Sequence, residues 1–480
     1  MIKKEVSGMK KNFLRAYLVL ALVLLSATCA WAKAPKYVFY FIGDGLGASQ
    51  RQAAEYYAQQ QKGDKKFKLA MDSFPVAGIN TTYSSDTLVT DSAAAGTALA
   101  TGYKTNNGII SQLPDGRSVK SLIEAAEERG WVTGIATTTR ITHATPAVFA
   151  SHNPSRDAEN EIAADMSDSG VEFIAGGGFR HFVSKDGEFK SKRKDNADLV
   201  ADMKKFGYKT FIGEKSTADF RNLKADGKSK VFAALTYSHL PYEIDRRNDN
   251  STPSIAEITQ KGIDVLTAYN KPFFFMIEGG RIDHACHAND AAGAILDTIA
   301  FDDAISKAMA FYKKHPKDTL IVVVGDHETG GMGLGFGTNY FLKMDALNKQ
   351  RVSVEDKVEK AYTGDKDAFF AFIGQNFGLT DLTDKERKAV MTAMEVQDKS
   401  ESGKSEYGYT PTQIAVSHIM SERANIQWTT FAHTGTQIPM SAMGVGASSF
   451  GGFKDNTVIA QKLAGLLGFR LSSYTVASAQ

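Results

Sequence analysis

The sequence predicts an α/β protein, a three-layer α/β/α sandwich around a large, mostly parallel sheet. Short apolar runs that end abruptly in glycine or acidic residues are typical of buried parallel strands. Longer amphipathic patterns between these runs are typical of helices. The chain has 480 residues, of which 43% are hydrophobic and 23% charged, as in folded globular proteins. Alternating strands and helices favour one large α/β unit.

Four apolar runs predict strands of this sheet, at residues 37–42, 132–136, 272–277 and 320–324. The segments 119–128 and 291–313 have the spacing of apolar residues that is expected of helices. Ligands of open α/β sheets bind beyond the carboxyl ends of the strands. The acidic and histidine residues that follow these runs are therefore the first candidates for a functional site.

Residues 335–430 differ from the rest of the chain because they are more polar. Amphipathic stretches at 354–362 and 384–393 predict that this segment is a mostly helical insertion. The catalytic α/β domain then consists of residues 33–334 and 431–480. The composition does not distinguish a lid from a surface for a homodimer.

Residues 1–32 have the features of a signal peptide that is cleaved on export. Five basic residues precede or flank the start of an apolar run at 16–25, and Ala30-Trp31-Ala32 has the small residues that signal peptidase recognises. The run is about half of the roughly 20 residues that a membrane-spanning helix needs. We therefore expect a periplasmic or secreted protein without a membrane span in the mature chain. Met9, which precedes two lysines, is an alternative start of translation.

The charge balance argues against a nucleic-acid partner. Removal of five basic and one acidic residue from 56 and 54 leaves 51 and 53, so the net charge changes from +2 to −2. Nucleic-acid-binding proteins normally have a marked basic excess or stripe. Cys286 is the single cysteine after cleavage, which excludes an internal disulfide. Packing or bound metal must then stabilise the exported protein.

Asp44 follows the first predicted strand, in the glycine-rich turn 43–48. This turn resembles a dinucleotide-binding motif, but the polar segment 59–68 stands where that motif requires a second strand. A single carboxylate at such a turn is most often a helix cap. Its significance depends on the other candidates along the chain.

Ser92 lies in the stretch Thr90-Asp91-Ser92-Ala93-Ala94, whose alanine-rich continuation predicts a helix that starts at this point. A helix cap is the simpler interpretation of Asp91 or Ser92. The same geometry also suits a nucleophile, because the positive end of the helix dipole favours an alkoxide and an attached phosphate. No Gly-x-Ser-x-Gly elbow surrounds Ser92, which disfavours an α/β-hydrolase esterase.

The densest cluster of metal-binding residue types lies at residues 278–287. Asp283 and His287 are four residues apart and therefore project from one face of a helical turn, while Glu278 ends the preceding strand. The pair Asp326-His327 ends another strand, and His433 precedes the apolar run 438–445. Nitrogen and oxygen ligands without thiolates suit Zn²⁺ at a catalytic site, and a carboxylate and hydroxyl set suits Mg²⁺.

In these motifs, from Phe39 to about Gly468, the sequence resembles the alkaline phosphatase family. The resemblance implies that Ser92 is the nucleophile and that Arg156 binds the substrate phosphate. It implies two zinc ions and one magnesium ion. Its metal ligands fall into three sets: Asp283, His287 and His433 for one zinc; Asp44, Asp326, His327 and Ser92 for the other; and Asp44, Thr145 and Glu278 for magnesium.

Two departures from the family pattern concern the third metal and the insertion. His143 and His284, next to the expected ligands, stand where some members carry aspartate and lysine and others carry histidine. They leave open which ion occupies the third site and how fast phosphate leaves. The segment between His327 and His433 is also longer than in compact members.

The resemblance implies an exported phosphomonoesterase that acts on small phosphate monoesters and releases inorganic phosphate. Ser92 would take the phosphoryl group and hydroxide would then remove it, with retention of configuration at phosphorus. One alternative is a sulfatase or phosphodiesterase of the same fold, although Ala94 replaces the proline of the sulfatase motif. The other is an exported metal- or phosphate-binding protein without catalysis, which would not need a nucleophile at a helix start.

Overall fold

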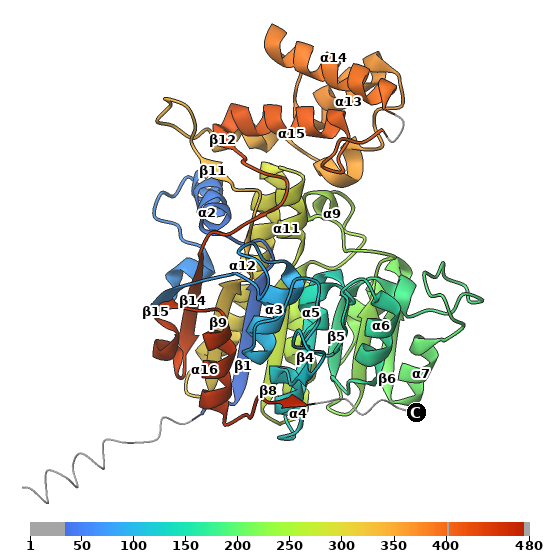
Figure 1. Ribbon diagram of the computed structural model, residues 1–480, viewed down its shortest axis with the longest axis vertical. Coiled ribbons are helices and arrows are strands. Elements are labelled where there is room, and N and C mark those ends of the chain that lie inside the picture. Colours follow the sequence, from blue (N-terminus) through green and yellow to red (C-terminus); the bar gives the residue numbers. More distant parts are fainter. Residues whose placement is uncertain (1–33, 401–402, 475–480) are drawn as a thin grey trace, which may run out of the picture.

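The computed structural model describes residues 34–400 and 403–474, so the predicted signal peptide lies outside the described residues. Its central feature is a ten-stranded sheet (Figure 1). In spatial order the strands are β15 (Gly452–Lys454), β2 (Val76–Asn80), β14 (Ile438–Gly444), β9 (Thr319–Gly325), β1 (Tyr37–Gly43), β8 (Phe273–Gly279), β4 (Val132–Arg140), β5 (Phe173–Gly177), β7 (Lys230–Ala234) and β6 (Tyr208–Ile212). Strand β14 is antiparallel to both of its neighbours, and the remaining pairings in this sheet are parallel. The predicted mostly parallel sheet is confirmed.

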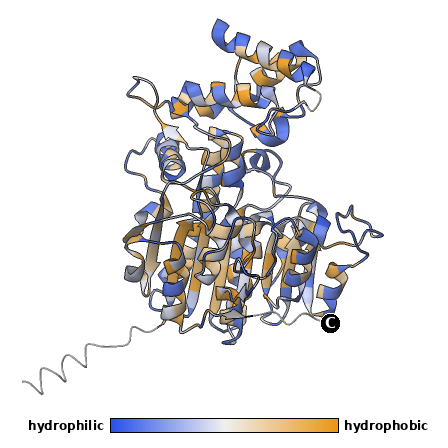
Figure 2. Cartoon of the chain, viewed as in Figure 1, coloured by the Kyte–Doolittle hydropathy of each residue, from blue (hydrophilic) through white to orange (hydrophobic). Residues whose placement is uncertain are grey.

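Helices cover both faces of the sheet, as a three-layer sandwich requires. Along β1, Phe39 and Phe41 belong to one hydrophobic core and Val38 and Tyr40 to the other, because successive side chains point to opposite faces. The first core includes residues of α2 (Ala48–Lys62), α8 (Thr217–Asn222), α9 (Glu243–Asp249), α10 (Ile255–Ala268) and α12 (Ala291–Lys314). The second includes residues of α3 (Ser92–Thr101), α4 (Leu122–Glu127), α6 (Glu159–Asp168), α7 (Leu199–Lys205) and α16 (Thr457–Leu467). Figure 2 shows the corresponding hydrophobic band along the central strands.

Strand β4 runs four residues further than the apolar pattern of the sequence predicts. We expected a strand at 132–136, but β4 continues to Arg140 through three threonines. These threonines are buried, and the hydroxyls of Thr137 and Thr139 donate hydrogen bonds to the Glu278 carboxylate on β8. Buried polar side chains therefore extend the strand where apolar periodicity has ended.

The helical insertion lies beyond the carboxyl ends of the strands (Figure 1). It begins and ends at the antiparallel pair of β11 (Gly333–Leu334) and β12 (Ile426–Gln427). Between these strands come a 3₁₀ turn (Met344–Lys349), a π-helical turn (Val354–Val358) and helices α13 (Lys366–Phe377), α14 (Asp384–Lys399) and α15 (Pro411–Ala424). Apolar residues of these elements belong to the first hydrophobic core of the α/β domain.

The helix that we expected at 354–362 is only the short π-helical turn at Val354–Val358. Other elements bind its backbone: Asp290 accepts from the Val354 N–H, and the Gln413 side chain donates to the carbonyls of Val354 and Glu355. These side-chain bonds replace part of the hydrogen bonding that a regular helix would provide. By contrast, the amphipathic segment at 384–393 is helical and extends to Lys399 as α14.

Candidate active site

The parallel register brings three acidic residues to one edge of the sheet. Strand β1 lies between β8 and β9, and Ile42 pairs with both Glu278 and Val324. Asp44 follows β1 and Asp326 follows β9, so both carboxylates lie at the same carboxyl edge as Glu278. All three residues are fully buried.

Ser92 is the first residue of α3, whose N-terminus is capped by the Asp91 side chain. Asp91 Oδ1 accepts a hydrogen bond from the Ala94 N–H at 2.9 Å. The Ser92 Oγ atom lies 3.1 Å from His327 Nε2 and 3.4 Å from Asp44 Oδ1. The hydroxyl therefore faces the acidic edge of the sheet from the positive end of a helix dipole.

Asp44, Asp326 and His327 form a first group of ligand atoms, which lie within 4.8 Å of one another. His327 Nε2 is 3.3 Å from Asp44 Oδ1 and 3.3 Å from Asp326 Oδ2. The other Asp326 oxygen accepts from the backbone N–H groups of Gly45 and His327. The two backbone N–H groups thus hold the Asp326 carboxylate so that its other oxygen, Oδ2, faces His327 Nε2.

Asp283, His327 and His433 form a second group within the same distance limit. His287 adjoins it, since its Nε2 atom is 3.1 Å from His433 Nε2 and 3.4 Å from Asp283 Oδ2. Asp283 and His287 come from the short helix α11 (Arg281–His287), and His433 from β13 (His433–Thr434), which pairs with β10 (Glu328–Thr329). Residues almost 150 positions apart in sequence thus meet at one point.

Backbone carbonyls orient the two outer histidines of this second group. The Nδ1 atoms of His287 and His433 contact the carbonyl oxygens of Phe431 at 2.6 Å and Thr90 at 2.8 Å. A carbonyl only accepts, so each Nδ1 carries a proton, and Nε2 is the ring nitrogen through which either histidine can bind a metal once that atom is deprotonated. The sequence had given no indication of these two carbonyl contacts.

Asp44, His143 and Glu278 form a third group, and here the structure differs from the ligand set that the resemblance implies. His143, which was expected next to the ligands, has Nδ1 4.0 Å from Asp44 Oδ2. Thr145 lies in the short helix α5 (Ala144–Ala147), and its Oγ1 is buried without a well-oriented hydrogen bond. The described residues thus offer an imidazole nitrogen as well as the threonine hydroxyl.

Several buried candidate ligand atoms of these groups make no well-oriented hydrogen bond within the described residues. They are Asp44 Oδ2, Asp326 Oδ2, Glu278 Oε1, His143 Nδ1 and Thr145 Oγ1. An unpaired buried polar atom costs roughly 1–3 kcal/mol, so five in one place call for a partner. Metal coordination satisfies such atoms, and oxygen and nitrogen donors without sulfur fit Zn²⁺ and Mg²⁺.

The acidic residues also repel one another. Burial and the neighbouring carboxylates raise the pKa values of Asp44 and Asp326 well above the ordinary range. Burial raises the pKa of Glu278 to about 7, although hydrogen bonds from Thr137 and Thr139 oppose the increase. A bound cation would relieve this repulsion.

Asp283 and His287 form an ion pair, with Asp283 Oδ2 3.4 Å from His287 Nε2. Burial alone would raise the pKa of Asp283, but the charge of His287 holds it well below its usual range. Burial alone would lower the pKa of His287, but Asp283 raises it to about 9. A metal at this group must therefore displace a proton from His287.

Arg156 approaches Ser92 from the side of the α3 N-terminus. Its Nη1 donates to Asp91 Oδ2 at 2.9 Å, and its Nη2 lies 3.2 Å from His143 Nε2. Asp91 thus caps the helix of Ser92 and anchors this arginine. A planar guanidinium in this position can bind two oxygens of a phosphate.

Comparisons with known proteins identify the family. A family model described as alkaline phosphatase matches residues 35–469. The chain belongs to the alkaline phosphatase family. It is accordingly an enzyme, a phosphoric monoester hydrolase.

Relatives within the alkaline phosphatase family match over most of their length. Alkaline phosphatase 3 of Bacillus subtilis is 33% identical over 446 residues, which cover 91% of this chain and 90% of the relative. The alkaline phosphatase structure from Thermus thermophilus has a TM-score of 0.80 and 30% identity, and the match covers 93% and 94% of the two chains. The cold-active enzyme of a psychrophilic Shewanella has a TM-score of 0.77 and 31% identity over 90% and 99%. These matches confirm the predicted fold class.

His239 is a residue of the site that the sequence did not reveal. It follows β7, and its ring centroid lies 4.4 Å from that of His284 and 5.7 Å from that of His143. A lone histidine in a segment with little patterning gives no signal in one sequence. Only the sheet order places the end of β7 near α11.

None of the helices within residues 34–400 and 403–474 combines the length and the apolar character that a membrane span requires.

Proposed function

We propose that this alkaline phosphatase hydrolyses phosphate monoesters through a phosphoserine intermediate at Ser92. The observation that carries the proposal is the position of Ser92 Oγ, 3.1 Å from His327 Nε2, beside five unpartnered buried ligand atoms. A nucleophile, a group of cation ligands and a phosphate-binding arginine thus adjoin one another. The family membership supports the same reaction.

We infer that the three groups hold two zinc ions and one magnesium ion. Asp283, His287 and His433 would hold one zinc, and Asp44, Asp326, His327 and Ser92 the other. Asp44, Glu278 and Thr145, with His143 as a further donor, would hold magnesium. A variant of the related Antarctic TAB5 enzyme in which glutamate replaces a histidine has Mg bound in its M3 site. When bound, such cations lower the pKa of an attacking hydroxyl or water and neutralise charge on the transferred group.

The residues of the chain bind and orient the substrate for two in-line steps. Arg156 is held by Asp91 and His143 and would bind two phosphoryl oxygens. Ser92 Oγ then attacks phosphorus opposite the leaving group, and a bond forms to Ser92 as the ester bond breaks. Water cleaves the phosphoserine in the second step, which returns the hydroxyl to Ser92 and retains the configuration at phosphorus.

Export and the role of the insertion are further parts of the proposal. Export to the periplasm or medium is inferred from residues 1–32, which lie outside the described residues. The insertion at 335–430 stays a candidate lid or homodimer surface. The near balance of charge, a net +2 in the full chain, supports a small phosphate monoester as substrate only in that it argues against a nucleic-acid partner.

The direct test compares the wild type with Ser92→Ala, using an aromatic phosphate monoester and a zinc determination on both proteins. We expect the variant to retain most of its zinc and to lose at least about 1000-fold in kcat/KM, because it lacks the nucleophile. Unchanged turnover in the variant would remove Ser92 from the mechanism. Zinc without turnover in either protein would favour the metal-binding alternative, and preferred hydrolysis of sulfate esters or phosphodiesters would favour the other enzyme classes.

A further inference from the structure

Arg281 is a buried cation that the proposed reaction does not use. It is the first residue of α11, the helix that carries Asp283 and His287, and only 3% of its surface is exposed. The backbone N–H groups of Gly280 and Arg281 both donate to Thr138 Oγ1, at 2.9 and 3.0 Å, which fixes the start of the helix on β4. A buried arginine requires charged partners.

These partners come from the insertion. Arg281 Nη2 donates to Asp356 Oδ2 at 2.8 Å, and Nη1 lies 3.6 Å from Glu355 Oε2. The guanidinium carbon lies 3.5 Å from the ring centroid of Tyr242, and the Tyr242 hydroxyl donates to Glu355. We call these four residues, Arg281, Tyr242, Glu355 and Asp356, the Arg281 clamp. It joins the π-helical turn of the insertion to the metal-ligand helix.

The clamp also reaches toward the phosphate site, through His284. Arg281 Nη1 lies 3.0 Å from His284 Nδ1. An arginine only donates, so Nδ1 accepts and the His284 proton resides on Nε2. No side chain or backbone group in the described parts of the chain accepts a hydrogen bond from this Nε2. Its N–H is therefore available to a ligand.

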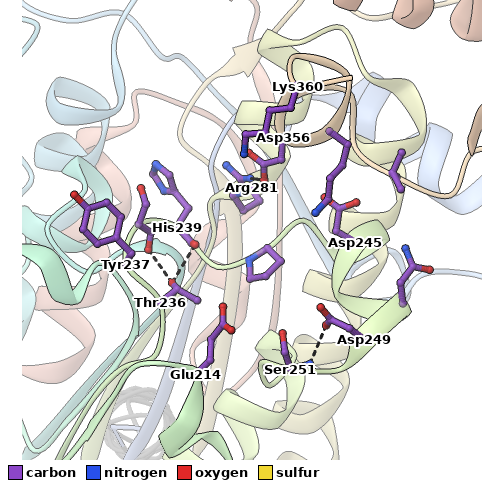
Figure 3. A pocket seen from close by; sticks show the side chains of 15 residues that line it. Glu214, Thr236, Tyr237, His239, Asp245, Asp249, Ser251, Arg281, Asp356 and Lys360 are labelled. Atoms are coloured by element: carbon purple, nitrogen blue, oxygen red, sulfur yellow. Dashed lines mark hydrogen bonds and ion pairs between the residues drawn. The ribbon is translucent and has the colours of Figure 1, made fainter. Parts of the chain in front are cut away.

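His284 is also close to the residues that would bind phosphate. Its ring centroid is 5.5 Å from that of His143, and His143 contacts the Arg156 guanidinium at 3.2 Å. Contacts therefore run without interruption from the insertion through Arg281, His284 and His143 to Arg156. Two clamp residues, Arg281 and Asp356, also line a pocket of 580 Å³, and Figure 3 shows them next to each other.

We propose that Arg281 is a positioning residue, through which the insertion holds His284 with its Nε2–H directed to the bound phosphate or to a water on it. This inference rests on the proposed function of the site. It assigns the insertion a part in phosphate affinity that does not require the insertion to move. The carboxylates of Glu355 and Asp356 would then act on the substrate only through Arg281.

The test removes the two insertion carboxylates with the double variant Glu355→Gln/Asp356→Asn and leaves the α/β body unchanged. The matched control is Glu359→Gln in the same segment, where Glu359 pairs with Lys404 at 2.7 Å and lies outside the clamp. Isothermal calorimetry of the zinc-loaded proteins gives the Kd for inorganic phosphate, and zinc analysis and thermal melting accompany it. We expect the double variant to raise this Kd about five-fold or more with zinc content unchanged, and the control to leave it within two-fold.

A mutant cycle tests whether the effect passes through His284. His284→Ala alone should raise the phosphate Kd, and adding the double variant to it should raise the Kd no further, because the group that the clamp holds is absent. Arg281→Lys should resemble the double variant, since an ammonium group does not reproduce the planar fork.

Three results would overturn the inference. The first is an unchanged phosphate Kd in the double variant. The second is a double variant that raises the Kd equally in the presence of His284 and in the His284→Ala background. The third is an increase of the Kd that occurs only together with a loss of zinc. Failure of the proposed function is a separate result, because it appears as wild-type protein that binds phosphate but does not hydrolyse monoesters.

Discussion

At the scale of single residues, Gly45 shows how closely the backbone approaches the candidate metal ligands. It follows Asp44 with φ +68°, and a Cβ atom there would lie 2.9 Å from Asp283 Cα and 3.0 Å from Thr329 Oγ1. Thr329 donates a short hydrogen bond to Asp283, so a side chain at position 45 would displace a ligand as well as strain the turn.

We therefore predict that Gly45→Ala lowers zinc content and reduces kcat/KM at least about tenfold, because ligand geometry is lost. Gly63→Ala is the matched control, since Gly63 has φ +62° with no atom within 4 Å of its Cβ position. The control should lose only about 1–2 kcal/mol of stability, the cost of a left-handed alanine, with normal zinc and turnover. Equal effects of the two variants on zinc would contradict the prediction.

The titration of two ligands predicts how metal affinity depends on pH. The ion pair with Asp283 raises the pKa of His287 to about 9, and burial raises that of Glu278 to about 7. Both groups must lose a proton before they bind a cation. Zinc affinity should therefore fall about tenfold per pH unit below about 9, and magnesium affinity at least about tenfold per unit below about 7. Calorimetric titrations at several pH values measure both slopes, and flat profiles across these ranges would show that His287 or Glu278 is not a ligand.

At the scale of elements, Glu386 is one of the residues that link α14 to α15 in the insertion. Glu386 accepts from the Thr383 N–H in a capping box and from Arg423 Nε at 2.7 Å on α15. The hydrogen bond from Arg423 lowers the pKa of Glu386 to about 2. This stabilisation is therefore present above about pH 4.5 and is lost as the pH falls toward 2.

We predict that Glu386→Ala destabilises this helix pair by about 1–2 kcal/mol at pH 8, because it removes a cap and an ion pair. Hydrogen exchange of the α14 amides and urea denaturation measure the effect. Glu395→Ala breaks the exposed contact with Lys366 at 3.7 Å and should cost less than about 0.5 kcal/mol. A larger loss in the second variant would show that the Arg423 contact is not the main link.

At the scale of the whole molecule, the candidate metal ligands lie where most of the fold converges. Strands β1, β8 and β9, helices α3, α5 and α11, and β13 each contribute a ligand or its support. Without cations, these elements bring repelling carboxylates and unpartnered polar atoms together.

Removal of the metals should therefore destabilise the entire α/β domain. With free zinc at about 1000 times its Kd, binding contributes about 4 kcal/mol to folding. We expect a chelator to lower the melting temperature in calorimetry by several degrees and added zinc to restore it. Ser92→Ala should show the same response if its zinc is retained. A melting temperature that does not depend on the chelator would mean that the cluster holds no tightly bound ion.

The sequence by itself determined the central strands of the sheet and the positions of most candidate ligands. Buried strands are encoded locally, because apolar runs such as 37–42 and 320–324 stand directly before Asp44 and Asp326. The four-residue spacing of Asp283 and His287 encodes a shared helical face in the same local way. Short-range periodicity therefore sufficed to identify these positions, and the family resemblance grouped them.

Only the tertiary structure decided which distant groups meet. The order of strands in the sheet places His239 beside His284, and the packing of the insertion places Asp356 on Arg281. The segment that follows the insertion places the Phe431 carbonyl on His287. It also placed His143 among the third group of ligands and limited the expected helix at 354–362 to a single turn. Such contacts depend on hydrogen bonds and ion pairs between residues far apart in sequence, which leave no periodic pattern in the chain.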